Sequence, residues 1–369
     1  MQFPSVLFNL LPYRPASTGL SHYVERLLTA WPKATGEPLP LQLRLDASGS
    51  TELSSDALLP GCKYSRRMRW LQANALVQHG VDFKRLVDKV NPTLIYSPYT
   101  DFLFGIGDCP QVLTCHDLTP LYFPSSRRSY WRSRLWLPLH LRRALKVIAI
   151  SQSVADHLVN TGISANRIEV IPNGVETIVD PLGGPVGFDF LMLTRHAINK
   201  NIALALKGFS RFLLLEPGWP GRLVVVGNEG RETSRLKQLE SDLGLHGRVS
   251  WVNHLDEDQL ERQMRVSYCL ISPSLMEGFD YPLFEAQALG LPTLASDISV
   301  HQEFHCDEAL LFDLHDDGID CSKKLHDLVS NPALWRELSL RGIANAKRYG
   351  LPRQAASICA LLKSIVGKS

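Results

Sequence analysis

The chain has 369 residues, of which 45% are hydrophobic and 21% charged, as is ordinary for a soluble globular protein with room for two domains. No apolar run is long enough to span a membrane, the N-terminus lacks a signal-peptide pattern, and seven irregularly spaced cysteines argue against a disulfide framework or a zinc site. We therefore expect a reduced, cytoplasmic protein. The net charge is only +2, but residues 1–186 hold 19 Lys and Arg against 14 Asp and Glu, so the first half is the candidate for an anionic partner.

The chain opens with a pattern typical of a doubly wound α/β domain. The apolar run Val6–Leu10 predicts a strand, a loop rich in Pro and Gly follows, and Tyr23–Trp31 has a helical pattern. Gly19 lies in this loop. It either lets the backbone approach a phosphate or forms a plain tight turn, and the residues alone leave both interpretations open.

A histidine follows a later strand of the same domain. Helical patterns at 65–78 and 82–90 precede predicted strands at 93–96 and 111–115, and His116 comes directly after the second strand. Open α/β sheets bind ligands at the carboxyl ends of their strands, so His116 is a candidate ligand contact. The alternative is a histidine that only ties down its loop.

Residues 125–146 carry seven basic side chains, and no acidic residue occurs from Leu118 to Ala155. Aromatic residues and leucines lie between the basic ones, and a second basic-aromatic cluster lies at 63–70. One interpretation is contact with a diphosphate-lipid acceptor or with an anionic membrane surface at the inner face of the plasma membrane. Its candidate arginines are Arg127, Arg128, Arg132, Arg134, Arg142 and Arg143. A solvated helix face that packs on its own domain explains the pattern equally well, whereas nucleic acid fits less well because no recognised module appears.

A weakly patterned segment separates two predicted domains. Strands at 147–150 and 168–171 flank a helical pattern at 152–161, and residues 177–188 are rich in Pro and Gly. The predicted organisation is an N-terminal domain over 1–176, a linker over 177–188, a second domain over 189–349 and a final helical segment over 350–369.

The second domain begins with a predicted strand at 190–193 and a loop that holds two cations. Arg195 and Lys200 flank this loop, which opens a long helical pattern. The positive end of a helix dipole disfavours cations, so a bound anion would explain their presence. A surface pair at a helix start is the alternative. Predicted strands at 222–226 and 249–252 follow.

The stretch 268–296 combines a strand, a loop, a helix and the start of a second strand. Pro282 suits the first helical position because its missing N–H would be unpaired there, and Gly290 marks the helix end. The loop holds Glu277, and the first turns of the helix hold Glu285. Unpaired N–H groups at the helix start suit a phosphate.

This stretch, with its pattern E-G-F-x-x-P-x-x-E, resembles the donor-site signature of family-four glycosyltransferases, the retaining nucleotide-sugar enzymes of GT-B fold. The resemblance extends over nearly the whole chain. It implies an α/β protein of two Rossmann-like domains facing across a cleft, whose C-terminal helix at 351–366 crosses back to the first domain. Asp280 and Tyr281 depart from the pattern, because members commonly carry glycine and an aliphatic residue there, close to the donor.

The resemblance also implies roles for the candidate residues. Glu277 would hold sugar hydroxyls and stabilise positive charge on the sugar ring, and His116 would contact the sugar. Arg195 and Lys200 match the family's arginine and lysine that grip the diphosphate, whose negative charge grows as the glycosidic bond breaks. Glu285 would hold the ribose. The other expected donor contacts are Gly19, Gly278, Phe279, Asp280 and Leu283.

We therefore expect transfer of a hexose, with retained configuration, from a nucleoside diphosphate sugar to an acceptor hydroxyl. The preferred setting is bacterial polysaccharide or lipid-linked glycan assembly, such as lipopolysaccharide or exopolysaccharide, with a mannose-like donor such as GDP-mannose. Neither a cofactor nor a divalent metal is expected, because the acidic run 256–258 stands at a predicted helix start where a capping role is expected. A sugar-nucleotide epimerase of the same fold and a non-catalytic sugar-nucleotide-binding protein remain alternatives.

Overall fold

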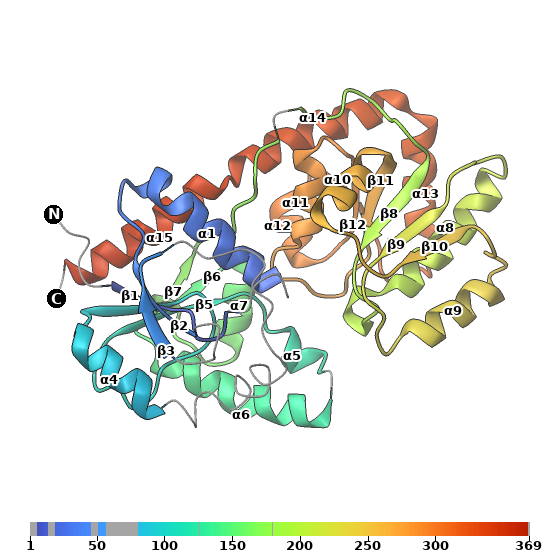
Figure 1. Cartoon of the computed structure of the whole chain (residues 1–369). Coiled ribbons are helices and arrows are strands. Elements are labelled where there is room, and N and C mark those ends of the chain that lie inside the picture. The colour runs from blue at the N-terminus through green and yellow to red at the C-terminus, as the bar shows by residue number, and fades with distance from the viewer. Residues whose placement is uncertain are drawn as a thin grey trace. The chain divides into compact units, whose positions relative to one another are not determined.

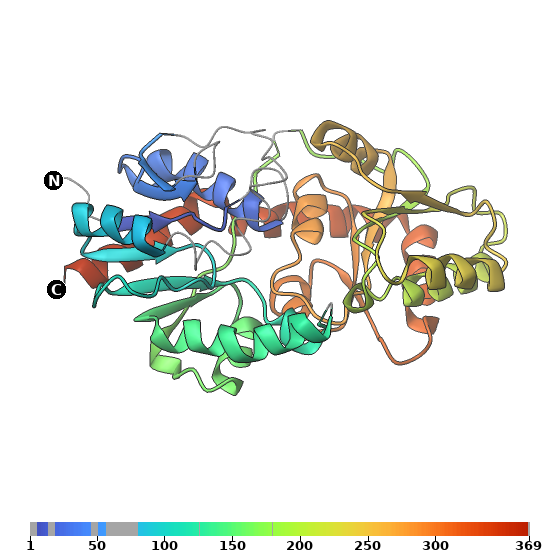
Figure 2. The same ribbon diagram turned by 60° about the horizontal axis from the view of Figure 1, so that its bottom comes forward.

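The computed structural model describes residues 6–13, 19–45, 51–56, 80–124, 126–178 and 180–367. The chain divides into two compact units, of which the first comprises 1–174 with 351–369 and the second comprises 175–350. Each unit is built on a mainly parallel sheet with helices packed on it (Figures 1 and 2). The predicted helix at 65–78 and the basic cluster at 63–70 lie outside the described residues.

The described part of the first unit contains a seven-stranded sheet in the order β3-β2-β1-β4-β5-β6-β7. All neighbours are parallel except β2 and β3. The strands are β1 (Val6–Asn9), β2 (Leu41–Leu45), β3 (Thr51–Ser54), β4 (Leu94–Ser97), β5 (Gln111–Cys115), β6 (Lys146–Ala149) and β7 (Ile168–Val170). The sequence predicts five of these strands within a residue or so, but not β2 and β3.

Helices cover both faces of this sheet. Along β1, Val6 and Phe8 join one core cluster while Leu7 joins the other, because successive side chains of a strand point to opposite faces. The described helices are α1 (Gly19–Thr35), α4 (Gly80–Val90), α5 (Thr119–Tyr122), α6 (Arg127–Arg143), α7 (Gln152–Asn160), the 3-10 turn η1 (Ala165–Arg167) and α15 (Leu351–Val366). The last helix, α15, packs against α1, so the predicted return of the chain to the first unit is correct.

The second unit contains a parallel sheet in the order β10-β9-β8-β11-β12-β13. Its strands are β8 (Asp189–Leu193), β9 (Leu223–Val226), β10 (Val249–Val252), β11 (Ser267–Ser272), β12 (Thr293–Ser296) and β13 (Leu310–Phe312). The strand order reverses between β8 and β11, which are hydrogen-bonded neighbours. A doubly wound sheet opens a crevice for ligands at such a point, outside the carboxyl ends of the two strands.

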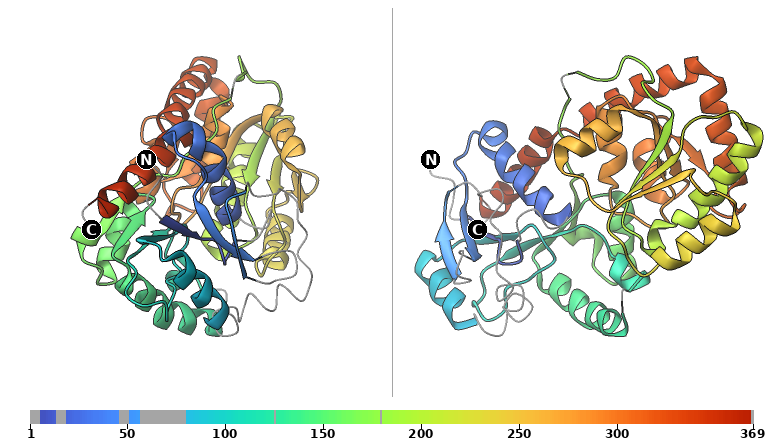
Figure 3. Two further views of the ribbon diagram at one scale, coloured as in Figure 1. Left: turned by 60° about the vertical axis from the view of Figure 1, so that its left-hand side comes forward. Right: turned by 45° about the vertical axis from the view of Figure 1, so that its right-hand side comes forward.

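Helices also pack on both faces of the second sheet (Figure 3). The described elements are η2 (Ile198–Lys200), α8 (Ile202–Leu215), α9 (Thr233–Asp242), α10 (Glu257–Arg265), α11 (Tyr281–Ala288), α12 (Ser299–His305), α13 (Ile319–Ser330) and α14 (Pro332–Arg348). Asp256 caps α10 as predicted, since its carboxylate accepts a hydrogen bond from the Gln259 N–H at 2.8 Å in a capping box. The segment predicted as a linker, 177–188, belongs to the second unit, where the Leu182 N–H donates to the Leu289 carbonyl at 2.7 Å.

Candidate functional site

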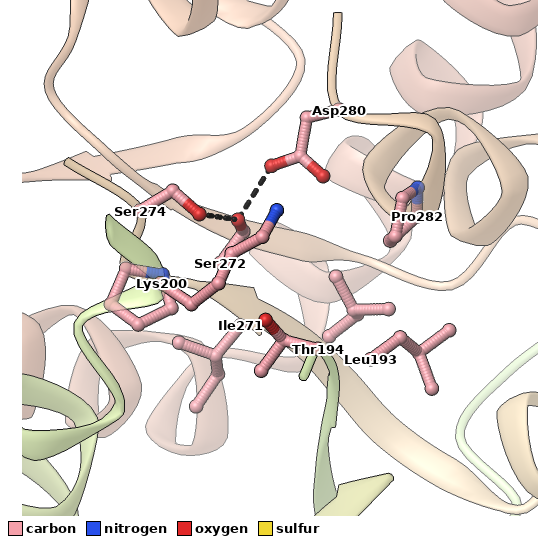
Figure 4. A pocket seen from close by; sticks show the side chains of 10 residues that line it. Leu193, Thr194, Lys200, Ile271, Ser272, Ser274, Asp280 and Pro282 are labelled. Atoms are coloured by element: carbon pink, nitrogen blue, oxygen red, sulfur yellow. Dashed lines mark hydrogen bonds between the residues drawn. The ribbon is translucent and has the colours of Figure 1, made fainter. Parts of the chain in front are cut away.

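A pocket lies where the strand order of the second sheet reverses (Figure 4). The ends of β8 and β11 form its floor, and the turn before α8 and the start of α11 complete its wall. Its lining residues are Leu193, Thr194, Lys200, Leu270, Ile271, Ser272, Pro273, Ser274, Asp280 and Pro282. The pocket therefore occupies the position at which a doubly wound sheet binds its ligand.

Lys200 and Glu277 form an ion pair at this pocket. The ammonium of Lys200 donates a hydrogen bond to Oε1 of Glu277, and Ser274 Oγ donates to the same oxygen at 2.6 Å. The backbone joins the two loops as well, because the Leu275 N–H donates to the Asn199 carbonyl at 2.8 Å. The structure thus brings together two of the residues that the sequence predicts as catalytic.

Asp280 is held in place by Ser272 and His301. Its Oδ2 accepts a hydrogen bond from Ser272 Oγ at 2.5 Å and lies 3.0 Å from Nε2 of His301 (the serine contact is drawn in Figure 4). The side chains of Asp280 and His301 are 3% and 0% exposed. Burial acts to raise the pKa of Asp280, but the hydrogen bond and charge of His301, with further help from Lys200 and Ser272, lower it to about 2. Asp280 is therefore ionised at neutral pH.

The two carboxylates differ in their protonation behaviour. Burial raises the pKa of Glu277, and the nearby Asp280 charge adds to this effect, while Lys200 opposes both. Burial acts to lower the pKa of Lys200, but the carboxylates of Glu277 and Asp280 raise it overall. Lys200 consequently remains an ammonium. Lys200 and Asp280 line the pocket, and Glu277 is hydrogen-bonded to Lys200.

Arg195 lies on the same loop as Lys200, and its side chain is exposed. Its positive charge acts on Lys200, which places the two cations near each other. The guanidinium makes no hydrogen bond or ion pair with any residue that the structure describes. An exposed guanidinium beside a half-buried ammonium is suited to an anionic ligand.

The loop and helix that carry the glutamates are anchored in the core. Phe279 is buried and stacks on Phe284, with ring centroids 4.3 Å apart, and Leu283 is fully buried. The Leu283 N–H donates to the Asp280 carbonyl at 3.1 Å. Among the remaining predicted donor contacts, Gly278 is buried and Glu285 is half-buried on α11. The side chains of Phe279 and Leu283 therefore hold the loop in place.

Two predicted site residues belong to the first unit. Nε2 of His116 lies 2.9 Å from the Pro98 carbonyl, and the imidazole packs edge-on against Tyr23. Burial lowers the pKa of His116, so the ring is neutral; Nε2 carries the proton and Nδ1 is left as an acceptor. Gly19 is exposed at the first position of α1.

The basic stretch forms helix α6 on the outside of the first unit (Figure 2). Four of its apolar side chains are 41–63% exposed: Trp131, Leu135, Trp136 and Leu139. Of the predicted arginines, Arg127, Arg134, Arg142 and Arg143 are also exposed, whereas the side chains of Arg128 and Arg132 lie outside the described part. The apolar side of α6 is thus not wholly packed on its own unit.

Three site residues were not predicted from the sequence. Ser272 and Ser274 follow the buried strand β11, and polar residues at the carboxyl end of a buried strand are a signal that could have found them. His301 stands 21 residues after Asp280 on another helix, and no local pattern connects the two.

Two features are absent from the described residues. No helix there is both long enough and apolar enough to cross a membrane. Within the same residues, His, Cys, Asp and Glu side chains form no group of three or more that could hold a metal ion.

Two family models match consecutive parts of the chain. The model described as Glycosyltransferase Family 4 matches residues 19–178, and the model described as Glycosyl transferases group 1 matches residues 187–349. Together they account for most of both units. The chain belongs to glycosyltransferase family 4.

Curated relatives of this family-4 glycosyltransferase match it in part. The O-antigen chain mannosyltransferase RfbU of Salmonella typhimurium is 27% identical over 209 residues, which are 54% of this chain and 56% of the relative. A D-inositol 3-phosphate glycosyltransferase of Acidothermus cellulolyticus is 30% identical over 51% of this chain and 46% of its own length. The chain thus spans about half the length of these two relatives.

Solved structures match the family-4 chain over nearly its whole length. The structure of Anabaena Alr3699/HepE in complex with UDP-glucose has a TM-score of 0.74 at 16% identity and covers 97% of this chain and 99% of its own. The sucrose-phosphate synthase of Thermosynechococcus elongatus has a TM-score of 0.73 at 18% identity and covers 99% and 100%. The predicted GT-B fold, with two Rossmann-like domains, is therefore confirmed.

Proposed function

We propose that this family-4 glycosyltransferase moves a hexosyl group from a nucleoside diphosphate sugar to an acceptor hydroxyl, with retained anomeric configuration and without a divalent metal. The observation that carries this proposal is the pocket between the ends of β8 and β11, where Lys200 and Glu277 are paired. An anion-binding cation and a sugar-binding carboxylate are the two groups that a nucleotide-sugar donor requires.

The cations serve the departing diphosphate. As the bond between the anomeric carbon and the diphosphate oxygen breaks, negative charge grows on that oxygen. Lys200 and the exposed Arg195 supply fixed positive charge for it, which lowers the free energy of the transition state. These two side chains take the place that a metal ion occupies in other nucleotide-sugar enzymes.

Glu277 serves the sugar. Its carboxylate stabilises positive charge on the ring as the glycosidic bond lengthens, and it accepts hydrogen bonds from sugar hydroxyls. The acceptor oxygen then forms its bond to the anomeric carbon on the face that the diphosphate leaves. Its proton passes to the departing phosphate oxygen, so the products are the glycoside and the nucleoside diphosphate.

The donor and setting are taken from the relatives. RfbU and a second matching relative, the serotype-specific mannosyltransferase WbdA of Escherichia coli, are named as mannosyltransferases, which supports GDP-mannose as donor and an O-antigen or other polysaccharide as product. The structural neighbour HepE is described with UDP-glucose, which makes that donor the comparison to include. His116 of the first unit is assigned to the sugar, and Glu285 to the ribose.

A donor screen tests this function. The purified chain is incubated with GDP-mannose or UDP-glucose, with and without a lipid-linked glycan acceptor and with EDTA, and products are assigned by NMR. We expect acceptor-dependent release of GDP, an α-linked product from the α-linked donor, and no loss of activity in EDTA. An epimerised nucleotide sugar formed without acceptor would establish the epimerase alternative, and binding without turnover would establish a non-catalytic protein.

We further propose that α6 holds the enzyme against an anionic membrane surface, at the inner face of the plasma membrane. Trp131, Leu135, Trp136 and Leu139 are exposed on a helix that also presents Arg127, Arg134, Arg142 and Arg143. Aromatic and aliphatic side chains insert among lipid headgroups while arginines contact their phosphates, and α6 contains no acidic residue to oppose this.

A further inference from the structure

The two ring nitrogens of His301 both face hydrogen-bond acceptors. Nδ1 lies 2.8 Å from the Ser296 carbonyl and 3.3 Å from Ser296 Oγ. That hydroxyl already donates its one hydrogen to the Ser274 carbonyl at 2.6 Å, so it can only accept from the imidazole. Nδ1 therefore carries a proton.

Nε2 of His301 faces Asp280 Oδ2 at 3.0 Å. The hydroxyl of Ser272 also donates its hydrogen to Oδ2, and the hydroxyl of Ser274 donates to Glu277. Oδ2 is therefore an acceptor in its contact with Ser272. Between a carboxyl and an imidazole in hydrogen-bond contact, the proton rests on the imidazole because it is the stronger base, so Asp280 is ionised. An ionised carboxylate accepts only, so Nε2 carries a proton as well, and the ring is an imidazolium.

The four ionised groups that are buried or half-buried here then balance, with Arg195 exposed beside them. Lys200 and His301 supply two positive charges, and Glu277 and Asp280 supply two negative ones. His305 of the same helix also faces the imidazolium, with ring centroids 6.2 Å apart. Burial, together with the charge of His301, lowers the pKa of His305 to about 3, so that ring is neutral at working pH.

Asp280 adopts a backbone conformation that favours glycine, with φ at 63°. Its side chain lines the pocket, and its other oxygen, Oδ1, makes no hydrogen bond to any described residue. An ionised acceptor at the pocket wall suits a hydroxyl-bearing ligand. Without a partner cation, however, a buried carboxylate beside Glu277 would be protonated or would draw Lys200 away from its pair.

We propose that His301 is a positioning residue: a buried imidazolium that keeps Asp280 ionised and fixed, so that Asp280 accepts a hydrogen bond from a hydroxyl of the donor sugar. This rests on the proposed transferase function and adds a determinant of sugar specificity to it. The recognised ligand is a nucleotide sugar with a hydroxyl at the position that meets Asp280. A deoxy analogue of the donor lacking that hydroxyl is a poorer substrate.

The protonation state is tested on the wild-type chain without any donor. Nitrogen-15 NMR of histidine-labelled protein, with His301 assigned by its absence in His301→Gln, reports both ring nitrogens. We expect two protonated nitrogens at pH 7. A single protonated nitrogen at that pH would overturn the proposal, and this measurement does not depend on turnover.

The positioning role is tested by a double-mutant cycle of His301→Gln and Asp280→Asn. His301→Gln alone leaves Asp280 buried without its cation, and we expect kcat/KM to fall about ten- to a hundredfold. In the double variant the unpaired charge is gone, so adding Asp280→Asn should recover part of this loss.

Additive losses in the cycle would overturn the positioning role. Absence of turnover by wild-type protein with every donor would instead overturn the proposed function, whatever the NMR result. The two failures are therefore distinguishable. Circular dichroism and the melting temperature of each variant establish that the losses do not come from unfolding.

Discussion

Lys200 and Glu277 are 77 residues apart in the chain, yet the lysine ammonium donates directly to Oε1 of the glutamate. Lys200 ends the short turn after β8, and Glu277 lies in the loop after β11. The two strands are neighbours at the reversal of the sheet order, so the topology of the sheet creates this pair. A change to either partner leaves a mostly buried charge behind, and this links ligand binding to stability.

Glu277→Gln keeps the shape of the side chain and removes its charge. We expect kcat to fall by about 10²–10³ because a preorganised group that stabilises charge in the transition state is lost. Steady-state kinetics with GDP-mannose measures this. Glu261→Gln is the matched control, since Glu261 is paired with Arg265 on an exposed helix. Unimpaired turnover in Glu277→Gln would remove this residue from catalysis.

Lys200→Ala and Arg195→Ala are both expected to weaken the binding of GDP. A charge-assisted hydrogen bond contributes about 1.5–3 kcal/mol, which is roughly tenfold to over a hundredfold in Kd. The variants differ in stability, because only Lys200→Ala leaves Glu277 without its partner, and its melting temperature should fall. Calorimetry and thermal unfolding measure the two effects. Lys207→Ala, which breaks an exposed ion pair with Asp317, is the control. Normal GDP affinity in both Lys200→Ala and Arg195→Ala would exclude these two residues from the binding site.

The α6 surface is tested by vesicle flotation. Wild-type protein should float with phosphatidylglycerol vesicles and less with phosphatidylcholine, and 1 M salt should reduce flotation because the Debye length shrinks from about 10 Å at 0.1 M to about 3 Å. Removing the exposed rings in Trp131→Ser/Trp136→Ser should weaken binding at least tenfold. Leu340→Ser, at an equally exposed apolar position on α14, is the control. Equal recovery on both lipids, or none on either, contradicts the proposed membrane contact.

Asp280 gives the folded protein a defined pH dependence. Its folded-state pKa, about 2, lies below the ordinary value of 3.8, so its contribution to stability is present above about pH 4 and is lost as pH falls toward 2. The full contribution is about 2 kcal/mol, and about half of it is gone at pH 3. Urea unfolding at pH 6 and pH 3 should show wild type losing about 1 kcal/mol more than Asp280→Asn. Parallel losses would contradict the ionised state.

Sequence patterns predicted the fold well because most of its strands are buried on both faces. The continuous apolar run in β8 and the run that ends at Ser272 need no tertiary information to be recognised as strands. By contrast, Thr51–Ser54 is a short edge strand with polar residues. Its own residues do not indicate a strand, and it forms one because it pairs with β2.

The residues of the candidate site were predictable only where a short stretch of sequence identifies them. Glu277 and Lys200 stand in recognisable loops, although their direct pairing emerges only from the neighbouring strands. The partner of Asp280 was not predictable, since His301 reaches it from a different helix. The left-handed backbone at Asp280 was also missed, because aspartate tolerates this conformation without requiring it.

Helix α15 has a consequence for biosynthesis. Its residues Ala355, Ile358 and Leu362 are fully buried in one cluster with Leu27 and Trp31 of α1. Residues 1–174 therefore emerge from the ribosome with this apolar face uncovered. All of 175–350 is translated before the covering helix emerges. At about 5–20 residues per second this interval is on the order of 10–40 s. The unit translated second can therefore finish folding first, and the unit translated first must stay protected from aggregation while it waits.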